Sequence, residues 1–216
     1  MFKSEKAVQV LNFFARKAME NKVVLHKTNA LKLLYLADKK HLRESTIRTI
    51  TGDSYKAQQM GPVAVHTFDI IETIAQEREG KIQSRGVEYA KDFLDVGYDN
   101  TMPQEKNASK SISIQSKEKV DMSKFSESDK VVLNEVWSVF GSLVGDRSAL
   151  WQETHKYPEG NKFEDMDRSQ QSIRESELIS VAKDGEKDLL GEMSENDVKE
   201  ATSIYRVRRL EWGDIV

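Results

Sequence analysis

Two neighbouring stretches decide the fold: residues 29–42 read NALKLLYLADKKHL, and residues 51–62 read TGDSYKAQQMGP. The first stretch predicts a helix from about residue 27 or 28 to about residue 43. Its apolar residues fall on two faces, with Leu31, Leu34, Tyr35 and Leu42 on one and Leu33 and Leu36 on the other. Because a helix that is apolar over most of its circumference is usually buried, we expect this helix at the centre of its domain. The second stretch contains two glycines and a proline, which favour turns.

Helical periodicity recurs on both sides of these stretches. The spacing of apolar residues predicts helices over residues 4–21, 61–76, 125–144, 146–157, 164–185 and 194–209, and Gly61 and Pro62 open the helix at 61–76. The segment 164–185 is charged with few apolar residues, so we expect a peripheral helix there. Ser-x-x-Asp patterns at Ser126 and Ser194 are typical of helix N-termini.

Strands are expected to be few. Residues 111–114 alternate serine and isoleucine, a period-two pattern that predicts a short strand. Its partner is left open between residues 87–93 and the β-branched run at 46–51. The expected fold class is therefore mainly α, a single compact multi-helix domain with a small β-hairpin or short strands.

The composition excludes several classes of protein. The 216 residues carry a net charge of −3 with a pI of about 5.9, so binding to nucleic acid through bulk charge is disfavoured. The chain has no cysteine, which excludes disulfides and thiol catalysis and fits a reducing cytoplasm. No apolar run approaches the ~18 residues of a membrane span, and residues 1–14 do not resemble a signal peptide. We expect a cytoplasmic protein.

Candidate chemical groups are sparse. His41 follows Asp38 by three residues, Asp69 follows His66 by three, and His155 ends a short helix. None of the histidines has metal-ligand spacing, and no nucleotide-binding or nucleophile-elbow motif is present. The sequence thus predicts no catalytic residue, no metal and no cofactor. An alternative is a small hydrolase or metal-dependent enzyme, which would need these groups to converge in one pocket.

The two opening stretches together resemble the signature of the Panacea, or SocA-like, antitoxin domain. The matching positions are Lys32, Leu33, Leu34, Tyr35, Ala37, Asp38, His41, Leu42, Ile50, Thr51, Gly52, Asp53, Tyr55, Ala57, Gly61, Pro62 and Val63. A weaker block at residues 148–158 matches at Leu150, His155, Lys156 and Pro158. The resemblance implies an antitoxin domain over residues 1–165, and we expect residues 166–216 to be a helical extension packed on it. We assign Asp38, His41, Gly52, Gly61 and Pro62 to the structural motif.

The resemblance implies a protein that binds and blocks a toxin encoded beside it. The expected partner is a cognate toxin. A homodimer, or a protease to which the chain delivers the toxin as an adaptor, are further alternatives, and neither a nucleic acid nor a membrane is expected as a partner. A DNA-binding regulator is the remaining alternative, although no helix-turn-helix is recognisable. Candidate partner-binding residues are Asp53, Tyr55, Met60, Trp151, His155 and Tyr157. Whether the connector at 51–62 only shapes the scaffold or also contacts the toxin stays open.

Overall fold

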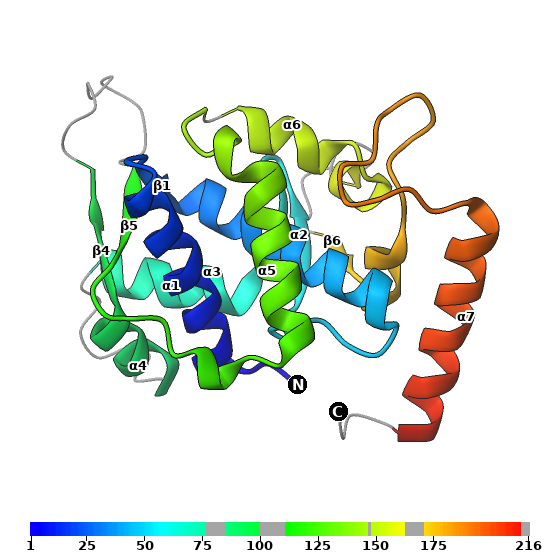
Figure 1. The fold of residues 1–216 in the computed structure, drawn as a ribbon, viewed down its shortest axis with the longest axis horizontal. Coiled ribbons are helices and arrows are strands. Elements are labelled where there is room, and N and C mark those ends of the chain that lie inside the picture. The colour runs from blue at the N-terminus through cyan, green and yellow to red at the C-terminus, as the bar shows by residue number, and fades with distance from the viewer. Residues whose placement is uncertain (77–84, 100–110, 147, 163–170, 213–216) are drawn as a thin grey trace.

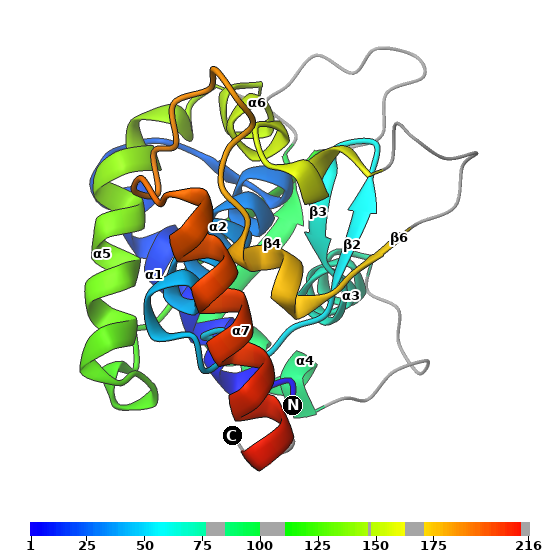
Figure 2. The same cartoon turned by 90° about the vertical axis from the view of Figure 1, so that its right-hand side faces the viewer.

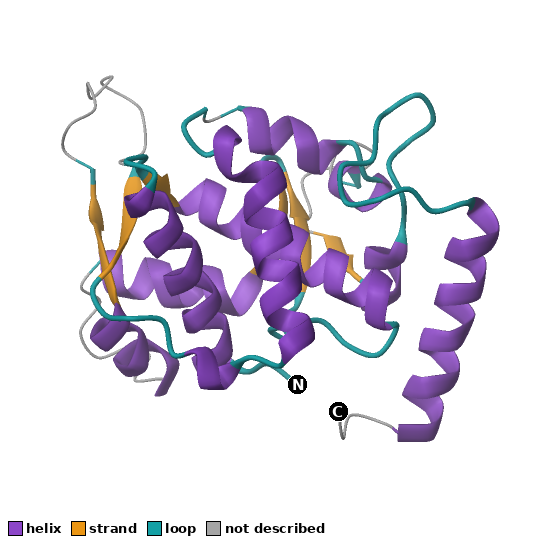
Figure 3. Ribbon diagram, in the orientation of Figure 1, coloured by secondary structure: helices purple, strands orange, loops and turns teal. Residues whose placement is uncertain are grey.

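The computed structural model describes residues 1–76, 85–99, 111–146, 148–162 and 171–212. Helices dominate this part of the chain, and short strands lie in two places between them (Figure 3). The α-helices are α1 (Ser4–Glu20), α2 (Lys27–Ser45), α3 (Val65–Ala75), α4 (Arg85–Phe93), α5 (Glu127–Phe140), α6 (Ala149–His155) and α7 (Glu195–Trp212). The 3-10 helices are η1 (Met122–Lys124), η2 (Gly141–Leu143), η3 (Pro158–Asn161) and η4 (Glu175–Ile179). The strands are β1 (Leu25–His26), β2 (Tyr55–Gln58), β3 (Gly61–Ala64), β4 (Leu94–Tyr98), β5 (Ile112–Ser116) and β6 (Gln171–Ile173).

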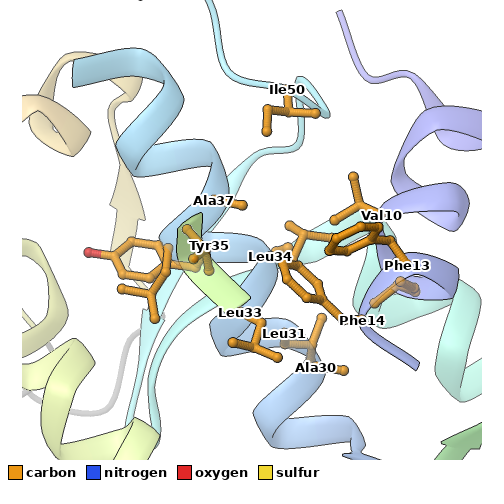
Figure 4. Packing of buried hydrophobic residues seen from close by; sticks show 14 of the residues in the cluster. Val10, Phe13, Phe14, Ala30, Leu31, Leu33, Leu34, Tyr35, Ala37 and Ile50 are labelled. Carbon is orange, nitrogen blue, oxygen red and sulfur yellow. The ribbon is translucent and has the colours of Figure 1, made fainter. Parts of the chain in front are cut away.

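Helix α2 forms the centre of the molecule, as predicted. It packs against α1, α5, α6, β3 and η4, which surround it (Figure 1). Leu33, Leu34 and Leu36 have no exposed surface, so both predicted apolar faces are buried. Figure 4 shows Phe14 of α1 beside Leu34, while Tyr35 points away from α1. Cutting one such leucine back to alanine costs about 2–5 kcal/mol, so each of these side chains contributes strongly to the stability of the fold.

The strand predicted near residues 111–114 is confirmed as β5, but neither proposed partner pairs with it. Strand β5 lies between β1 and β4, both antiparallel to it, with Ile114 opposite Leu25 and Val96. Residues 87–93 belong to α4, in which Val87 and Ala90 lie three residues apart and are both buried. Residues 46–51 form bends and irregular backbone.

The helix predicted to begin at Gly61 begins four residues later. Residues 61–64 form β3, which pairs with β2 in a tight hairpin, and β6 pairs with the other side of β2. Pro62 is tolerated because β3 is an edge strand, where a missing N–H costs no ladder bond. Helix α3 starts at Val65, where the Asp53 carboxylate accepts bonds from the backbone N–H groups of His66 and Thr67. The helix therefore receives its cap from the preceding connector.

The C-terminal region is less helical than predicted. Of the peripheral helix expected over 164–185, the described part forms β6 and η4, because Ile173, Leu178 and Ile179 are buried and leave no amphipathic helical stripe. The division placed between residues 165 and 166 lies outside the described residues. Helix α7 is confirmed, and Ser194 and Asp197 exchange the two hydrogen bonds of its predicted cap. The fold class is confirmed as mainly α in a single domain with short strands.

Candidate functional site

Asp38 fixes the connector to the central helix. Its side chain is fully buried and accepts hydrogen bonds from the Thr51 N–H at 3.0 Å, from the Thr51 hydroxyl and from the Tyr55 hydroxyl at 2.8 Å. Burial raises the pKa of Asp38 to about 7, although the bonds from Thr51 and Tyr55 act in the opposite direction. The three bonds tie α2 to both ends of residues 51–55. The structural role that the sequence indicates for Asp38 matches this geometry.

Asp53 performs the same task for α3. Its carboxylate accepts bonds from the backbone N–H groups of Ser54, His66 and Thr67 and from the Thr67 hydroxyl. The His66 Nδ1 lies 2.9 Å from the same carboxylate. The partner of His66 is thus Asp53 and not Asp69, whose side chain is exposed. Through these bonds Asp53 holds the connector against the N-terminus of α3.

Two glycines let the connector pass close to its neighbours. Gly61 has a φ of +83°, and a Cβ there would lie 2.8 Å from His155 Cε1 and 2.9 Å from Lys32 Nζ. Gly52 has a φ of +68°, and a Cβ there would lie 2.3 Å from the backbone oxygen of Met1. Both positions combine a left-handed backbone with no room for a side chain, which only glycine satisfies without strain.

Lys32 joins the hairpin to α2 from inside the protein. Its side chain is 1% exposed, and its ammonium donates a 2.9 Å bond to the Pro62 carbonyl. Burial lowers the pKa of Lys32 to about 7, and no carboxylate in the part of the chain that the structure describes offsets the lost hydration. The lysine and the Gly61-Pro62 pair of the motif therefore meet in space.

A buried ion pair on the same side of α2 escaped the sequence analysis. Lys39 Nζ lies 2.7 Å from Glu159 Oε1, which also accepts a 2.7 Å bond from the Tyr35 hydroxyl. Lys39 further donates to the Leu178 and Ser180 carbonyls. The spacing of Lys32, Tyr35 and Lys39 at positions i, i+3 and i+7 places them on one face of α2, and this pattern could have indicated the site from the sequence.

Tyr55 and Tyr157, two of the candidate partner-binding residues, are buried at 2% exposure. Each ring packs edge-on against Tyr35, with centroids 5.7 Å and 6.5 Å away. The Tyr157 hydroxyl donates to Asp188, and the Tyr55 hydroxyl donates to Asp38. Neither ring is therefore available in this structure as an exposed anchor, because both the ring and the hydroxyl are engaged inside the protein.

Met60, Trp151 and His155 keep accessible surface. Met60 is half-exposed at the turn between β2 and β3, and Trp151 and His155 are half-buried on α6 with their rings 4.5 Å apart. Gly61 lies against His155, so the turn and α6 are adjacent. These three of the six expected residues therefore lie near one another on one part of the surface.

The groups of the enzyme alternative do not converge. His41 lies 3.2 Å from Asp129 and shares its other nitrogen with the Arg48 carbonyl, while His155 bonds to the Trp151 carbonyl. Burial lowers the pKa of His41, despite the nearby Asp129 charge. Within the described ranges, no set of three histidine, aspartate or glutamate side chains is arranged to hold a metal ion. Over the same ranges, none of the helices has the length and apolar character needed to cross a membrane.

A groove of about 480 Å³ lies beside the connector. One wall is formed by residues 47–49 and 52–55 with Lys3 and His66, and the other by Ser172, Ile173, Glu175, Leu178, Arg208 and Arg209. The first wall comes from the connector, the N-terminal residues and α3, and the second comes from β6, η4 and α7. The groove thus brings together segments that are more than 100 residues apart in the chain.

The comparisons with known proteins agree with the motif. The sequence matches a family model described as "Antitoxin SocA-like, Panacea domain" over residues 31–160, which is more than half of the chain. No curated protein and no solved structure matches this chain. The matched segment includes most of α2, the connector, the β2–β3 hairpin and most of η3, and so contains Lys32, Asp38, Asp53 and Glu159. The chain belongs to the SocA-like Panacea antitoxin family.

Proposed function

We propose that this protein is an antitoxin that neutralises a cognate toxin by direct protein–protein binding. Family membership over residues 31–160 is the observation that carries the proposal. The geometry supports it, because the polar residues of the motif are committed to internal contacts. Asp38 holds Thr51 and Tyr55, and Asp53 holds the start of α3. A motif used in this way gives a rigid scaffold on which surface residues can vary.

Direct binding requires anchors on the surface of this scaffold. Met60, Trp151 and His155 are proposed as one contact, because they are the accessible members of the expected set and lie near one another. Trp151 also has a buried Nε1 without a hydrogen-bond partner among the described residues. A partner carbonyl that reached this N–H would satisfy it.

Co-expression with the protein encoded by the adjacent gene tests the proposal. Growth is expected to stop when the neighbour is expressed alone and to recover when this chain is expressed with it. The two proteins should also co-purify. The amount of the neighbouring protein should be the same with and without this chain, and recovery should persist when individual proteases are deleted. Recovery that needs a protease would replace direct inhibition by the adaptor function. A harmless neighbour that does not bind this chain would refute the proposal.

A further inference from the structure

The groove between the connector and the C-terminal segment has a surplus of positive charge that the fold does not use. We propose that it binds an acidic peptide segment of the toxin; this inference rests on the proposed function and assigns it a contact surface. Figure 2 shows α7, β6 and the N-terminus on the side of the molecule that faces the viewer. Residues from all three line the groove. Of its two walls, the one formed by β6, η4 and α7 follows residue 160, outside the segment matched by the family.

The positive charge comes from residues at one end of the groove. Lys3 and Arg48 line it, and Lys6 lies behind them in α1. The pKa of Lys3 is lowered by partial burial and then by the charges of Arg48 and Lys6, so these three cations lie close enough to repel one another. Arg48 Nη1 is buried and has no hydrogen-bond partner among the residues that the structure describes. This nitrogen therefore lacks an acceptor, which is costly for a buried donor.

The carboxylate nearest this cluster is already committed. Asp129 forms a 2.5 Å contact with Lys6, lies 3.2 Å from His41 and accepts the Ser126 N–H of the α5 cap. Burial would raise the pKa of Asp129, but the bonds from Lys6 and Ser126 lower it, so the group is ionised near neutral pH. One carboxylate therefore faces three cations. The excess charge remains on the groove side.

The two acids that line the groove, Asp53 and Glu175, offset only part of this charge, because Lys3, Arg48, Arg208 and Arg209 line it as well. Asp53 is held by the α3 N-terminus and His66, and Glu175 accepts bonds from the Thr49 N–H and the Tyr205 hydroxyl. Arg208 bonds to two neutral acceptors, the Ser45 carbonyl and the Thr46 hydroxyl. Among the described residues, Lys3, Arg48 and Arg208 form no ion pair with either acid. An anionic partner would meet uncompensated charge in a partly desolvated site.

A peptide fits this groove better than a nucleic acid. Ile47, Ile173 and Leu178 contribute apolar lining beside the cations, a mixture that suits acidic and apolar side chains in one segment. A volume of about 480 Å³ accommodates a few side chains and does not track a phosphate backbone. The whole chain carries a net charge of −3, which repels an extended polyanion while a local cationic groove still attracts a short acidic segment.

A charge-reversal pair tests the inference. The variant Lys3→Glu/Arg48→Glu reverses the two unpaired cations, and Lys119→Glu/Lys187→Glu makes the same change in net charge at two exposed lysines outside the groove. Binding to the purified product of the adjacent gene should weaken about tenfold or more in the first variant and stay within about twofold in the second. Raising the salt concentration should weaken binding of the wild type and the control more than that of the first variant. Thermal unfolding of each variant serves as the check that the fold is kept.

Peptide and nucleic-acid probes identify the occupant. Overlapping peptides that cover the neighbour's sequence should include an acidic one that binds the wild type and loses affinity with the groove variant. A fluorescent single-stranded oligonucleotide should not bind with comparable affinity. Tight oligonucleotide binding that depends on Lys3 and Arg48, without peptide binding, would overturn the inference. Equal neutralisation by the wild type and a folded groove variant would overturn it while leaving the antitoxin function intact, whereas a wild type that neutralises nothing would remove both.

Discussion

Charged and polar side chains on the central helix are part of the core of this protein. Lys32, Tyr35 and Lys39 lie on one face of α2, and each meets an acceptor from a distant segment. Lys32 bonds to a single neutral carbonyl, whereas Lys39 has a carboxylate and two carbonyls. Lys32 is therefore the more costly of the two to keep protonated, because its buried ammonium has no counter-charge among its hydrogen-bond acceptors.

Lys32→Met is expected to stabilise the protein. The folded pKa of Lys32 is about 7, against 10.5 in the unfolded chain. Above pH 10.5 the lysine is neutral in both states, so its burial causes no loss of stability from this source. As the pH falls toward 7, the unfolded chain binds the proton more readily than the folded one, and the folded state loses stability. Each unit of the pKa difference costs the wild type about 1.4 kcal/mol at pH 7, and methionine removes this cost. The lost bond to Pro62 offsets about 1 kcal/mol of the gain, so Lys32→Met should be roughly 3 kcal/mol more stable than the wild type at pH 7.

Urea unfolding at several pH values checks this expectation. The advantage of the methionine variant should shrink as the pH rises from 7 toward 10. A variant that is less stable than the wild type at pH 7, or a difference that does not change with pH, contradicts the assignment of a neutralised buried lysine.

Asp38→Asn is expected to lower the free energy of unfolding by about 2 kcal/mol, because an amide cannot accept all three bonds from Thr51 and Tyr55. Asp95→Asn, at an exposed position of β4, serves as the control and should change stability by less than about 0.5 kcal/mol. Chemical unfolding monitored by circular dichroism measures both. An equal, small effect of the two changes would show that Asp38 does not hold the connector.

Elements whose signals are local were predictable from the sequence, and elements that depend on distant partners were not. Helices α2, α5 and α7 carry their own apolar spacing or caps, as Ser126 with Asp129 shows. Strand β3 was predicted as a helix start because Gly61-Pro62 is a common opening, whereas the actual cap of α3 is Asp53, which lies 13 residues before His66. Strand β6 pairs with β2 across more than 100 residues, which no local pattern reveals.

The same distinction applies to the candidate site. Asp38, Gly52, Gly61 and Pro62 could be assigned to a structural motif from the sequence, since turn residues have local conformational signatures. The burial of Tyr55 and Tyr157 could not, because a tyrosine's internal acceptor cannot be recognised in a linear pattern. The groove was missed for the same reason, because its walls come from residues 3, 47–55 and 172–209.

The Asp188 carboxylate is one of the groups that attach the C-terminal segment to α2. Asp188 receives two bonds from the Arg43 guanidinium of α2, one from the Tyr157 hydroxyl and two from backbone N–H groups. Both ionic side chains are nearly buried, at 4% and 7% exposure. Removing one partner of a buried pair leaves an uncompensated charge, which costs about 3–5 kcal/mol.

Asp188→Ala should therefore loosen the segment from residue 181 to α7. Limited trypsin digestion followed by mass spectrometry is expected to show faster cleavage there than in the wild type, with α2 still protected. Asp184→Ala, at an exposed neighbouring position, should be digested like the wild type. Protection of the segment in the Asp188 variant would argue that apolar packing by Leu178, Leu190 and Tyr205 is sufficient.

The molecule as a whole combines a family scaffold with a region beyond the family match. The scaffold centres on α2 and holds its connector and hairpin by buried polar bonds. The segment after residue 160 lies against α2 through Lys39, Arg43 and Asp188 and completes the cationic groove. The proposed contact with an acidic peptide therefore lies where these two parts of the molecule meet.

Titration of the purified toxin with this purified chain tests the central claim most directly. Direct inhibition predicts that the toxin's activity falls linearly and reaches zero at a fixed molar ratio, the same ratio at which a stable complex saturates in light scattering. Complete loss of toxin activity at a small fraction of that ratio, with the toxin chemically altered or destroyed, would show turnover and would contradict the account.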